Sequence, residues 1–356
     1  MTPDVNLHIL VRRFTQLSKA GFFDPAFIEF SQRTADAAQH VLDELGYYAE
    51  ETVREFSGLL WNVLRFISGS RSNDAPHETQ YALRKALSEW VQSDALVSSA
   101  SLDDLNFYVS LADLWSFIEK TLDRFDTGGY GPLIVQIGSP SVYQHRPVFC
   151  IPLFHELGHF IDYHRKITEV TILQNLTPKP TSLPMSDADW QQMCTNHRME
   201  HFADLFGACY CGVATNKSLY SIAPTAVTSF THPSTASRIQ VVNDFLSGTQ
   251  NPVVDLFQDA LANLGLPNLA VRFSEPDVTC FDDVLTCRLR DESELYGLFL
   301  SSWNYLEVQL QKRTAPWITD DATTYTIEKT VNDLTEKSLR NFEISERWSD
   351  VIANKS

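Results

Sequence analysis

Two histidines and a glutamate stand together in an H-E-x-x-H pattern, at His155, Glu156 and His159. On a helix, residues four apart lie on one face, so both imidazoles can reach one metal ion. Glu156 lies about 100° further round the helix and can accept a proton from water without binding the metal itself. A bound zinc ion lowers the pKa of water to about 7, and a neighbouring carboxylate can then act as general base. The pattern therefore predicts zinc-dependent amide hydrolysis.

The pattern is short enough to occur by chance, so its surroundings must supply a helix and a further ligand. Residues 149–164 are typical of a helix, with Pro152 suited to its first turn and apolar residues at helical spacing. The alternative is a pair of histidines on the solvent face of an amphipathic helix. A third protein ligand would separate the two interpretations, because catalytic zinc sites normally offer three.

Glu200 is the candidate third ligand. Ser186 predicts a capped helix start, and the helix continues through Glu200 and Asp204, which share a face. Their apolar neighbours indicate burial, where a carboxylate is costly unless it binds metal or accepts hydrogen bonds. We therefore predict that Glu200 binds the metal and that Asp204 accepts a hydrogen bond from the far nitrogen of a metal-bound histidine. A solvated acidic stripe is the alternative.

The motif, followed by an E-x-x-A-D pattern that begins at Glu200, resembles the gluzincin class of zinc metallopeptidases. That class takes a glutamate from a second helix as its third ligand. An H-P-x-x-x-x-R-I pattern that begins at His232 resembles the membrane-embedded CAAX prenyl-protein endopeptidases and their bacterial heat-shock relatives. The resemblance covers about residues 133–240, with the three motifs in the family's order. This chain lacks the long apolar helices of those relatives, so a membrane substrate is not expected.

The resemblance implies roles for His232 and Arg238. In the family this histidine lies near the carbonyl oxygen under attack, and this arginine lies near the glutamate ligand. His232 would then be a catalytic residue that stabilises the oxyanion, and Arg238 would support the glutamate or bind substrate. The alternative is that residues 231–234 only begin a helix, with Pro233 in its first turn.

A short apolar segment precedes the motif, and residues 133–138 are predicted to form a strand. In gluzincins the strand before the motif helix is the edge that binds extended substrate. The resemblance thus implies that Leu133, Val135 and Ile137 bind substrate, by pairing of this strand with a peptide backbone. An interior strand without a substrate role is the alternative.

The composition is that of a folded protein, with 356 residues that are 44% hydrophobic and 12% aromatic. A net charge of −17 without a Lys/Arg cluster disfavours nucleic acid as a partner. The longest apolar stretch, residues 58–67, is too short to span a bilayer, and no secretory signal is visible. We therefore expect no membrane insertion and a cytoplasmic location. Six cysteines are too few for a disulfide framework at this length and are expected to be reduced.

Helical patterns dominate the chain. The predicted fold is mainly α, an α+β helical protein whose zincin-like core contains a small sheet. Besides the two motif helices, helices are predicted at residues 24–45, 50–66, 78–91, 101–125, 254–264, 289–311 and 327–342, and the clearest linker at residues 68–76. We predict three regions: an N-terminal helical region (1–125), a zincin-like catalytic core (126–245) and a C-terminal helical region packed on the core (246–356).

These features together predict a soluble zinc metallopeptidase that holds one Zn²⁺ ion and acts on a protein or peptide substrate. An unrestrained protease would damage its own cell, so the long helical flanks favour a selective, regulatory or toxin-like enzyme. The flanks would restrict access to the site or bind a regulatory protein partner. Two alternatives stay open. One is a helical interaction protein in which zinc only staples two helices, with His197 or His201 as fourth ligand; the other is a zinc hydrolase of a non-peptide amide.

Overall fold

The computed structural model describes residues 2–22, 24–71, 77–91, 95–102, 106–111 and 113–353. These residues form a mainly helical α+β protein with a small sheet, which confirms the predicted fold class. The chain divides into two compact units. Unit 1 comprises Met1–Gln80 and Val91–Gln144, and unit 2 comprises Tyr81–Trp90 and His145–Ser356. Within unit 2, helices from either side of residue 245 pack against one another, and the three predicted regions stay a prediction.

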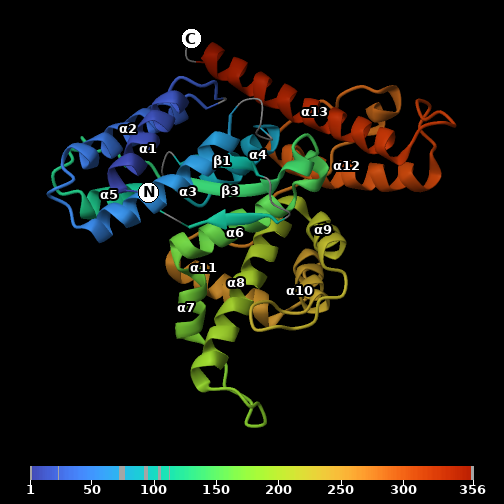
Figure 1. The fold of residues 1–356 in the computed structure, drawn as a ribbon. Helices are drawn as coiled ribbons and strands as arrows, with labels where there is room; N and C mark the ends of the chain where they lie inside the picture. Colours follow the sequence, from blue (N-terminus) through green and yellow to red (C-terminus); the bar gives the residue numbers. More distant parts are fainter. Residues whose placement is uncertain are drawn as a thin grey trace. The chain divides into compact units, whose positions relative to one another are not determined.

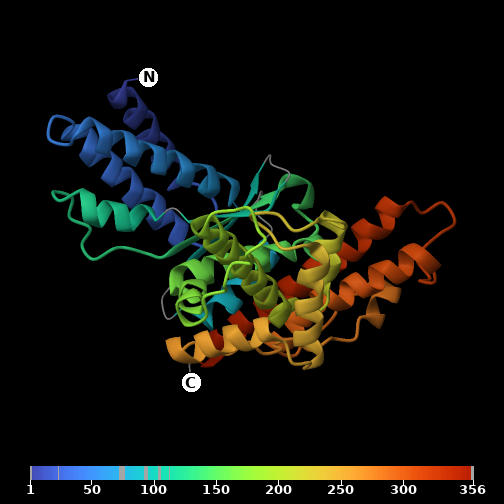
Figure 2. The same ribbon diagram turned by 90° about the horizontal axis from the view of Figure 1, so that it is seen from below.

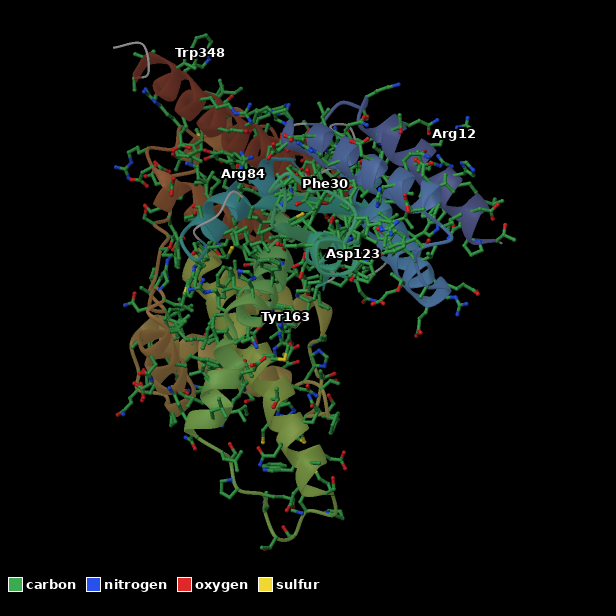
Figure 3. The ribbon with its side chains drawn as sticks, turned by 90° about the vertical axis from the view of Figure 1, so that its left-hand side faces the viewer. Arg12, Phe30, Arg84, Asp123, Tyr163 and Trp348 are labelled. Atoms are coloured by element: carbon green, nitrogen blue, oxygen red, sulfur yellow. The ribbon has the colours of Figure 1, made fainter. Side chains whose placement is uncertain are left out.

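The helices of unit 1 share one apolar core (Figure 1): α1 (Pro3–Leu17), α2 (Ala26–Asp43), α3 (Glu50–Gly69) and α5 (Leu114–Thr121). Their inward faces repeat at helical spacing, as Phe56, Leu60 and Val63 do in α3. The buried Phe30, marked in Figure 3, meets the ring of Trp115 edge-on with centroids 6.3 Å apart. Helices α2 and α3 match the predicted ones. Residues 72–76 of the predicted linker lie outside the described residues.

A three-stranded sheet completes unit 1, with β1 (Leu96–Leu102), β2 (Tyr108–Ser110) and β3 (Ile134–Pro140) in the order β1-β3-β2. The helix predicted at residues 101–125 is therefore wrong in its first half, and residues 103–105 and 112 lie outside the described residues. Its second half contains α5, whose start is capped by the Asp113 side chain accepting from the Ser116 amide. Strands β1 and β2 take their hydrogen bonds from β3, a partner distant in sequence that a local helical pattern does not reveal.

Strand β3 is the central strand of this sheet and not an edge. It pairs in parallel with β1 along its whole length, and antiparallel with β2 at residues 136–138. Every residue of β3 is buried, and the Leu133 carbonyl just before it accepts from the Leu96 amide. Strand addition needs unpaired backbone groups. Strand β1 uses those on one side of β3 along its length, and β2 uses those on the other side at residues 136–138. The predicted edge is therefore not open at Ile137, and a substrate-binding role for Leu133 and Val135 stays a prediction.

Unit 2 contains the motif helices and the C-terminal helices (Figures 1 and 2). In chain order these are α6 (Pro152–Arg165), α7 (Ile167–Gln174), α8 (Asp187–Cys211), α9 (Ala214–Ile222), α10 (Thr235–Ser247), α11 (Pro252–Leu264), α12 (Glu292–Lys312) and α13 (Thr324–Ala353). Helix α8 is central, because α6, α7, α9, α10, α11 and α12 all contact it. Its start is capped as predicted, with the Ser186 hydroxyl accepting from the Asp189 amide at 3.0 Å.

Unit 2 also takes residues from an early part of the chain. Helix α4 (His77–Ser88) crosses the boundary between the units, so that its residues from Tyr81 onward belong to unit 2. Lys85 forms an ion pair with Glu292 of α12 at 2.8 Å, and the Trp90 indole donates to the Tyr210 hydroxyl at 2.8 Å. Unit 2 is therefore assembled from two stretches of sequence that unit 1 separates.

Helices α6 and α8 approach closely at Gly158. A Cβ added there would stand 2.8 Å from the Ala203 Cα and 3.0 Å from the Phe206 Cβ. Only glycine fits a contact this close between helix backbones. The closeness matters because the predicted metal ligands lie on these two helices.

Within the described residues, no helix has the length and apolar character needed to cross a membrane. All six cysteines are free thiols.

Replacement of Gly158 by alanine is expected to destabilise the protein by about 1–3 kcal/mol, because the new methyl group overpacks the contact between α6 and α8. Urea denaturation measures the change. Gly58 is the matched control, since it lies mid-helix in α3 with nothing within 4 Å of an added Cβ. Gly58→Ala should instead stabilise by about 0.5–1 kcal/mol through helix propensity. Equal effects at the two positions would show that the close contact is absent.

Candidate metal centre

Helices α6 and α8 bring His155, His159 and Glu200 together. Among the described residues, these three form the one group of metal-ligating side chains whose donor atoms all lie within 4.8 Å of one another. The Glu200 oxygens lie 3.6 Å from His155 Nε2 and 3.4 Å from His159 Nε2. The two rings, four residues apart on α6, have centroids 4.6 Å apart. The structure thus assembles the three residues predicted as metal ligands.

The orientation of His155 suits a metal ligand. Its Nδ1 lies 3.0 Å from Asp204 Oδ1, and an ionised carboxylate only accepts hydrogen bonds. The proton of the neutral imidazole therefore sits on Nδ1, which leaves the Nε2 lone pair facing Glu200. Lone pairs that converge in this way repel one another unless a cation lies between them. Two nitrogens and one carboxylate oxygen are a donor set that fits zinc.

His159 has fewer partners than His155. Its Nδ1 is buried and has no hydrogen-bond partner among the described residues. Burial lowers the pKa of His159, but the Glu200 carboxylate at Nε2 more than offsets this, and the pKa lies above its ordinary value. In protonated His159, the proton on Nε2 pairs with the Glu200 carboxylate. A metal cation bound at Nε2 would take the place of this proton and pair with the same carboxylate.

Arg238 neutralises the two buried carboxylates of α8. Its Nε and Nη2 lie 2.6 and 2.7 Å from the Asp204 oxygens, and its Nη1 lies 3.0 Å from Glu200 Oε2. Burial raises the pKa of Glu200, but a hydrogen bond from His159 and the charges of both histidines and Arg238 bring it to about 2. Burial also raises the pKa of Asp204, and the charge and hydrogen bonds of Arg238 outweigh it, so this pKa falls well below its ordinary range.

Glu156 and His232 flank the cluster. Glu156 follows His155 on α6, is partly exposed, and acts through its charge on both His159 and Arg238. His232 lies in the loop between α9 and α10, with its side chain 55% exposed and its Nε2 3.4 Å from Glu200 Oε1. The residues expected to act as base, as oxyanion donor and as support for the ligands therefore gather within one unit of the fold.

Several expected residues are not part of this group. Leu133, Val135 and Ile137 belong to unit 1, and the group belongs to unit 2. The two histidines considered as a fourth ligand, His197 and His201, are not in the metal-ligating group. His197 Nε2 instead hydrogen-bonds the Ser229 carbonyl at 2.8 Å. The described group therefore offers three protein ligands rather than four.

Sequence reasoning missed the residues that hold the loop around His232. The Thr231 hydroxyl lies 2.8 Å from His232 Nδ1, and the Ser229 hydroxyl accepts from the His232 amide at 3.0 Å. The only signal in the sequence was a pair of hydroxyl residues close before a histidine, a combination common in turns.

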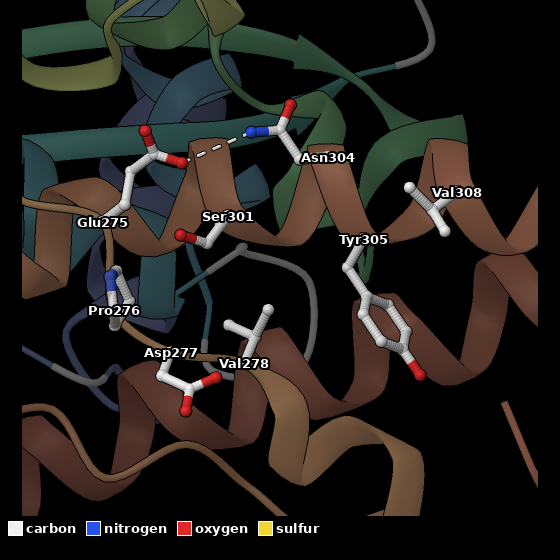
Figure 4. Close-up of a pocket in the computed structure, with 8 residues that line it drawn as sticks. All are labelled: Glu275, Pro276, Asp277, Val278, Ser301, Asn304, Tyr305 and Val308. Atoms are coloured by element: carbon white, nitrogen blue, oxygen red, sulfur yellow. Dashed lines mark hydrogen bonds between the residues drawn. The ribbon is translucent and has the colours of Figure 1, made fainter.

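A separate hollow of about 330 Å³ opens between residues 275–278 and one face of α12 (Figure 4). Ser301, Asn304, Tyr305 and Val308 line it at helical spacing. One turn earlier, a Cβ on Gly297 would stand 1.9 Å from the Ser274 carbonyl oxygen, so the start of this segment is pressed against the helix. None of the predicted site residues lines the hollow, and it is not the location of the predicted chemistry.

Comparison of the chain with protein-family models, with curated proteins and with solved structures found no match in any of the three.

The metal-free protein is expected to lose stability as the pH falls from about 5 to about 2. Glu200 and Asp204 have pKa values below their ordinary 4.5 and 3.8, so the unfolded chain binds more protons than the folded chain in this window. The part due to Glu200 is on the order of 3 kcal/mol, because its pKa lies about 2.5 below the ordinary value and each pKa unit is worth about 1.4 kcal/mol. Urea denaturation of the zinc-free chain at several pH values measures it. Glu200→Gln should reduce the pH dependence, and equal slopes in the two proteins would contradict the assignment.

Proposed function

We propose that this chain is a zinc-dependent peptidase whose metal ligands are His155, His159 and Glu200. The observation that carries the proposal is the convergence of two imidazole nitrogens and a carboxylate within 4.8 Å. Catalytic zinc sites normally offer three protein ligands and keep a position open, whereas structural sites usually close with four. Three ligands in the described residues therefore support hydrolysis over the stapling alternative.

The residues around the ligands have distinct roles in this proposal. Bound zinc supplies a Lewis acid that lowers the pKa of water to about 7 and polarises the substrate carbonyl. Asp204 keeps the His155 proton on Nδ1, so that Nε2 stays available. Glu156 accepts the proton released as water attacks the carbonyl carbon and passes it to the leaving amine. Arg238 keeps Glu200 and Asp204 ionised in their buried positions.

His232 is the proposed oxyanion donor. As water attacks, the carbonyl oxygen gains negative charge, and a donor aimed at it is typically worth a few kcal/mol of barrier. The position of Nε2 next to a ligand oxygen of Glu200 supports this role. The proposed substrate is a protein or peptide, the amide class that the gluzincin resemblance implies.

Glu156→Gln is expected to abolish hydrolysis while zinc binding and the fold are retained. The amide keeps the shape of the side chain but cannot take the proton, and loss of a general base typically costs about 10²–10⁴-fold in rate. Comparative mass spectrometry of proteins cleaved in cells that express the wild type or the variant measures the loss, and elemental analysis measures the zinc. Glu169→Gln on α7, where the side chain is 64% exposed, is the control and should act like the wild type.

Full biological activity of the Glu156→Gln protein would contradict the peptidase proposal and favour a zinc staple between helices. If the wild type cleaves small amides but not peptides, the peptidase proposal is wrong, and the result favours a zinc hydrolase of a non-peptide amide.

Removal of zinc is expected to lower the melting temperature and to abolish hydrolysis. Zinc binds the folded cluster only, so a free concentration 1,000 times the Kd stabilises by about 4 kcal/mol. Thermal unfolding with and without a chelator, followed by addition of zinc, measures the effect. His159→Ala is the matched control, and its melting temperature should not respond to the chelator. If the melting temperature of the wild type also does not respond to the chelator, the cluster binds no zinc.

A further inference from the structure

The two ring nitrogens of His232 face different partners. Nε2 lies 3.4 Å from Glu200 Oε1, at the metal-ligating group. Nδ1 lies 2.8 Å from the Thr231 hydroxyl, on the other side of the ring. A neutral imidazole carries one proton, so what His232 can do at the site depends on which nitrogen holds it.

The partners favour one of the two tautomers. With the proton on Nε2, the ring presents a donor to the Glu200 carboxylate, which only accepts, and the Thr231 hydroxyl donates to Nδ1. With the proton on Nδ1, a lone pair on Nε2 would face the carboxylate and repel it. The Ser229 hydroxyl lies 3.4 Å from the Thr231 hydroxyl and donates its own proton to the His232 carbonyl at 3.3 Å.

The backbone of the turn is fixed independently of Thr231. His197 donates to the Ser229 carbonyl at 2.8 Å, and Asn196 donates to the Phe230 carbonyl at 3.2 Å. Within the turn, the Ser229 amide donates to the His232 carbonyl at 2.9 Å. His197 and Asn196 lie one turn before Glu200 on α8, so the turn is fastened beside the metal ligand. The half-exposed ring of His232 can still rotate or change tautomer, and the Thr231 hydroxyl and the Glu200 carboxylate are the groups that face its two nitrogens.

We propose that Thr231 is a positioning residue that holds His232 as the neutral Nε2–H tautomer. This inference rests on the proposed peptidase function. In this form His232 donates a hydrogen bond to the substrate oxyanion and has no lone pair directed at the metal. A histidine within reach of the cluster would otherwise be able to close the site with a fourth ligand. Thr231 therefore keeps the site open as well as keeping the donor in place.

The test compares Thr231→Val, which has the same shape without the hydroxyl, with Thr231→Ser, which restores it. The full chain saturated with zinc is studied by long-range ¹H–¹⁵N correlation of its imidazoles, with the His232 signals assigned from His232→Ala. The wild type and Thr231→Ser should show a protonated Nε2 and an unprotonated Nδ1. Thr231→Val should show a mixture of tautomers or a metal-bound Nε2.

Steady-state kinetics on a peptide found by the cell-based comparison give the second readout. His232→Ala should lower kcat about 100-fold. Thr231→Val should lower kcat about tenfold at unchanged KM, and Thr231→Ser should recover most of the loss. A structural role alone would instead lower the melting temperature and affect both variants alike.

An unchanged Nε2–H signal and wild-type kcat in Thr231→Val would overturn the inference, as would a Thr231→Ser protein as impaired as Thr231→Val. If the wild type hydrolyses no peptide, the proposed function fails, but the spectra of His232 still decide whether Thr231 sets its tautomer.

Discussion

Two carboxylates lie buried one helical turn apart on α8, and the guanidinium of Arg238 makes their burial tolerable. An ionised carboxylate out of water is costly unless it is paired and hydrogen-bonded, and Glu200 and Asp204 both depend on the same cation. Removal of Arg238 would leave a double negative charge in the interior. Because Asp204 also orients His155, one buried cation on α10 supports groups on both α6 and α8.

The geometry of this centre follows from helix periodicity combined with one close contact. The four-residue spacing on α6 and on α8 puts His155 with His159, and Glu200 with Asp204, on facing sides of two helices. Gly158 then lets the backbones come near enough for short side chains to converge on one point.

The sequence was sufficient to predict that His155, His159 and Glu200 come together and that a strand lies near residues 133–138, but not the order of the sheet or the unit boundary. His155, His159 and Glu200 could be found because their positions within helices are local information. The burial of Asp204 could be inferred from its apolar neighbours. Strands β1 and β2 could not be predicted, because their stability comes from hydrogen bonds to β3, which follows them in sequence only after α5. Because β1 and β2 both pair with β3, this strand is the centre of its sheet rather than the expected edge. The role proposed for Thr231 depends on the orientation of the His232 ring, which the spacing of residues in the sequence does not reveal.

Helix α4 has a consequence for how the molecule is made. Unit 2 needs residues 81–90 together with α12 and α13, which emerge much later in synthesis. The Trp90 indole donates to the Tyr210 hydroxyl in the folded protein. During translation this partner is missing until the strands of the sheet and then the chain up to Tyr210 have been synthesised. Unit 1 has all its sequence by residue 144 and can close first, whereas unit 2 cannot complete its core until α12 and α13 have been synthesised. The candidate metal centre lies in unit 2, and all of its residues are synthesised after those of unit 1, so this order of synthesis leaves the centre incomplete while unit 1 closes.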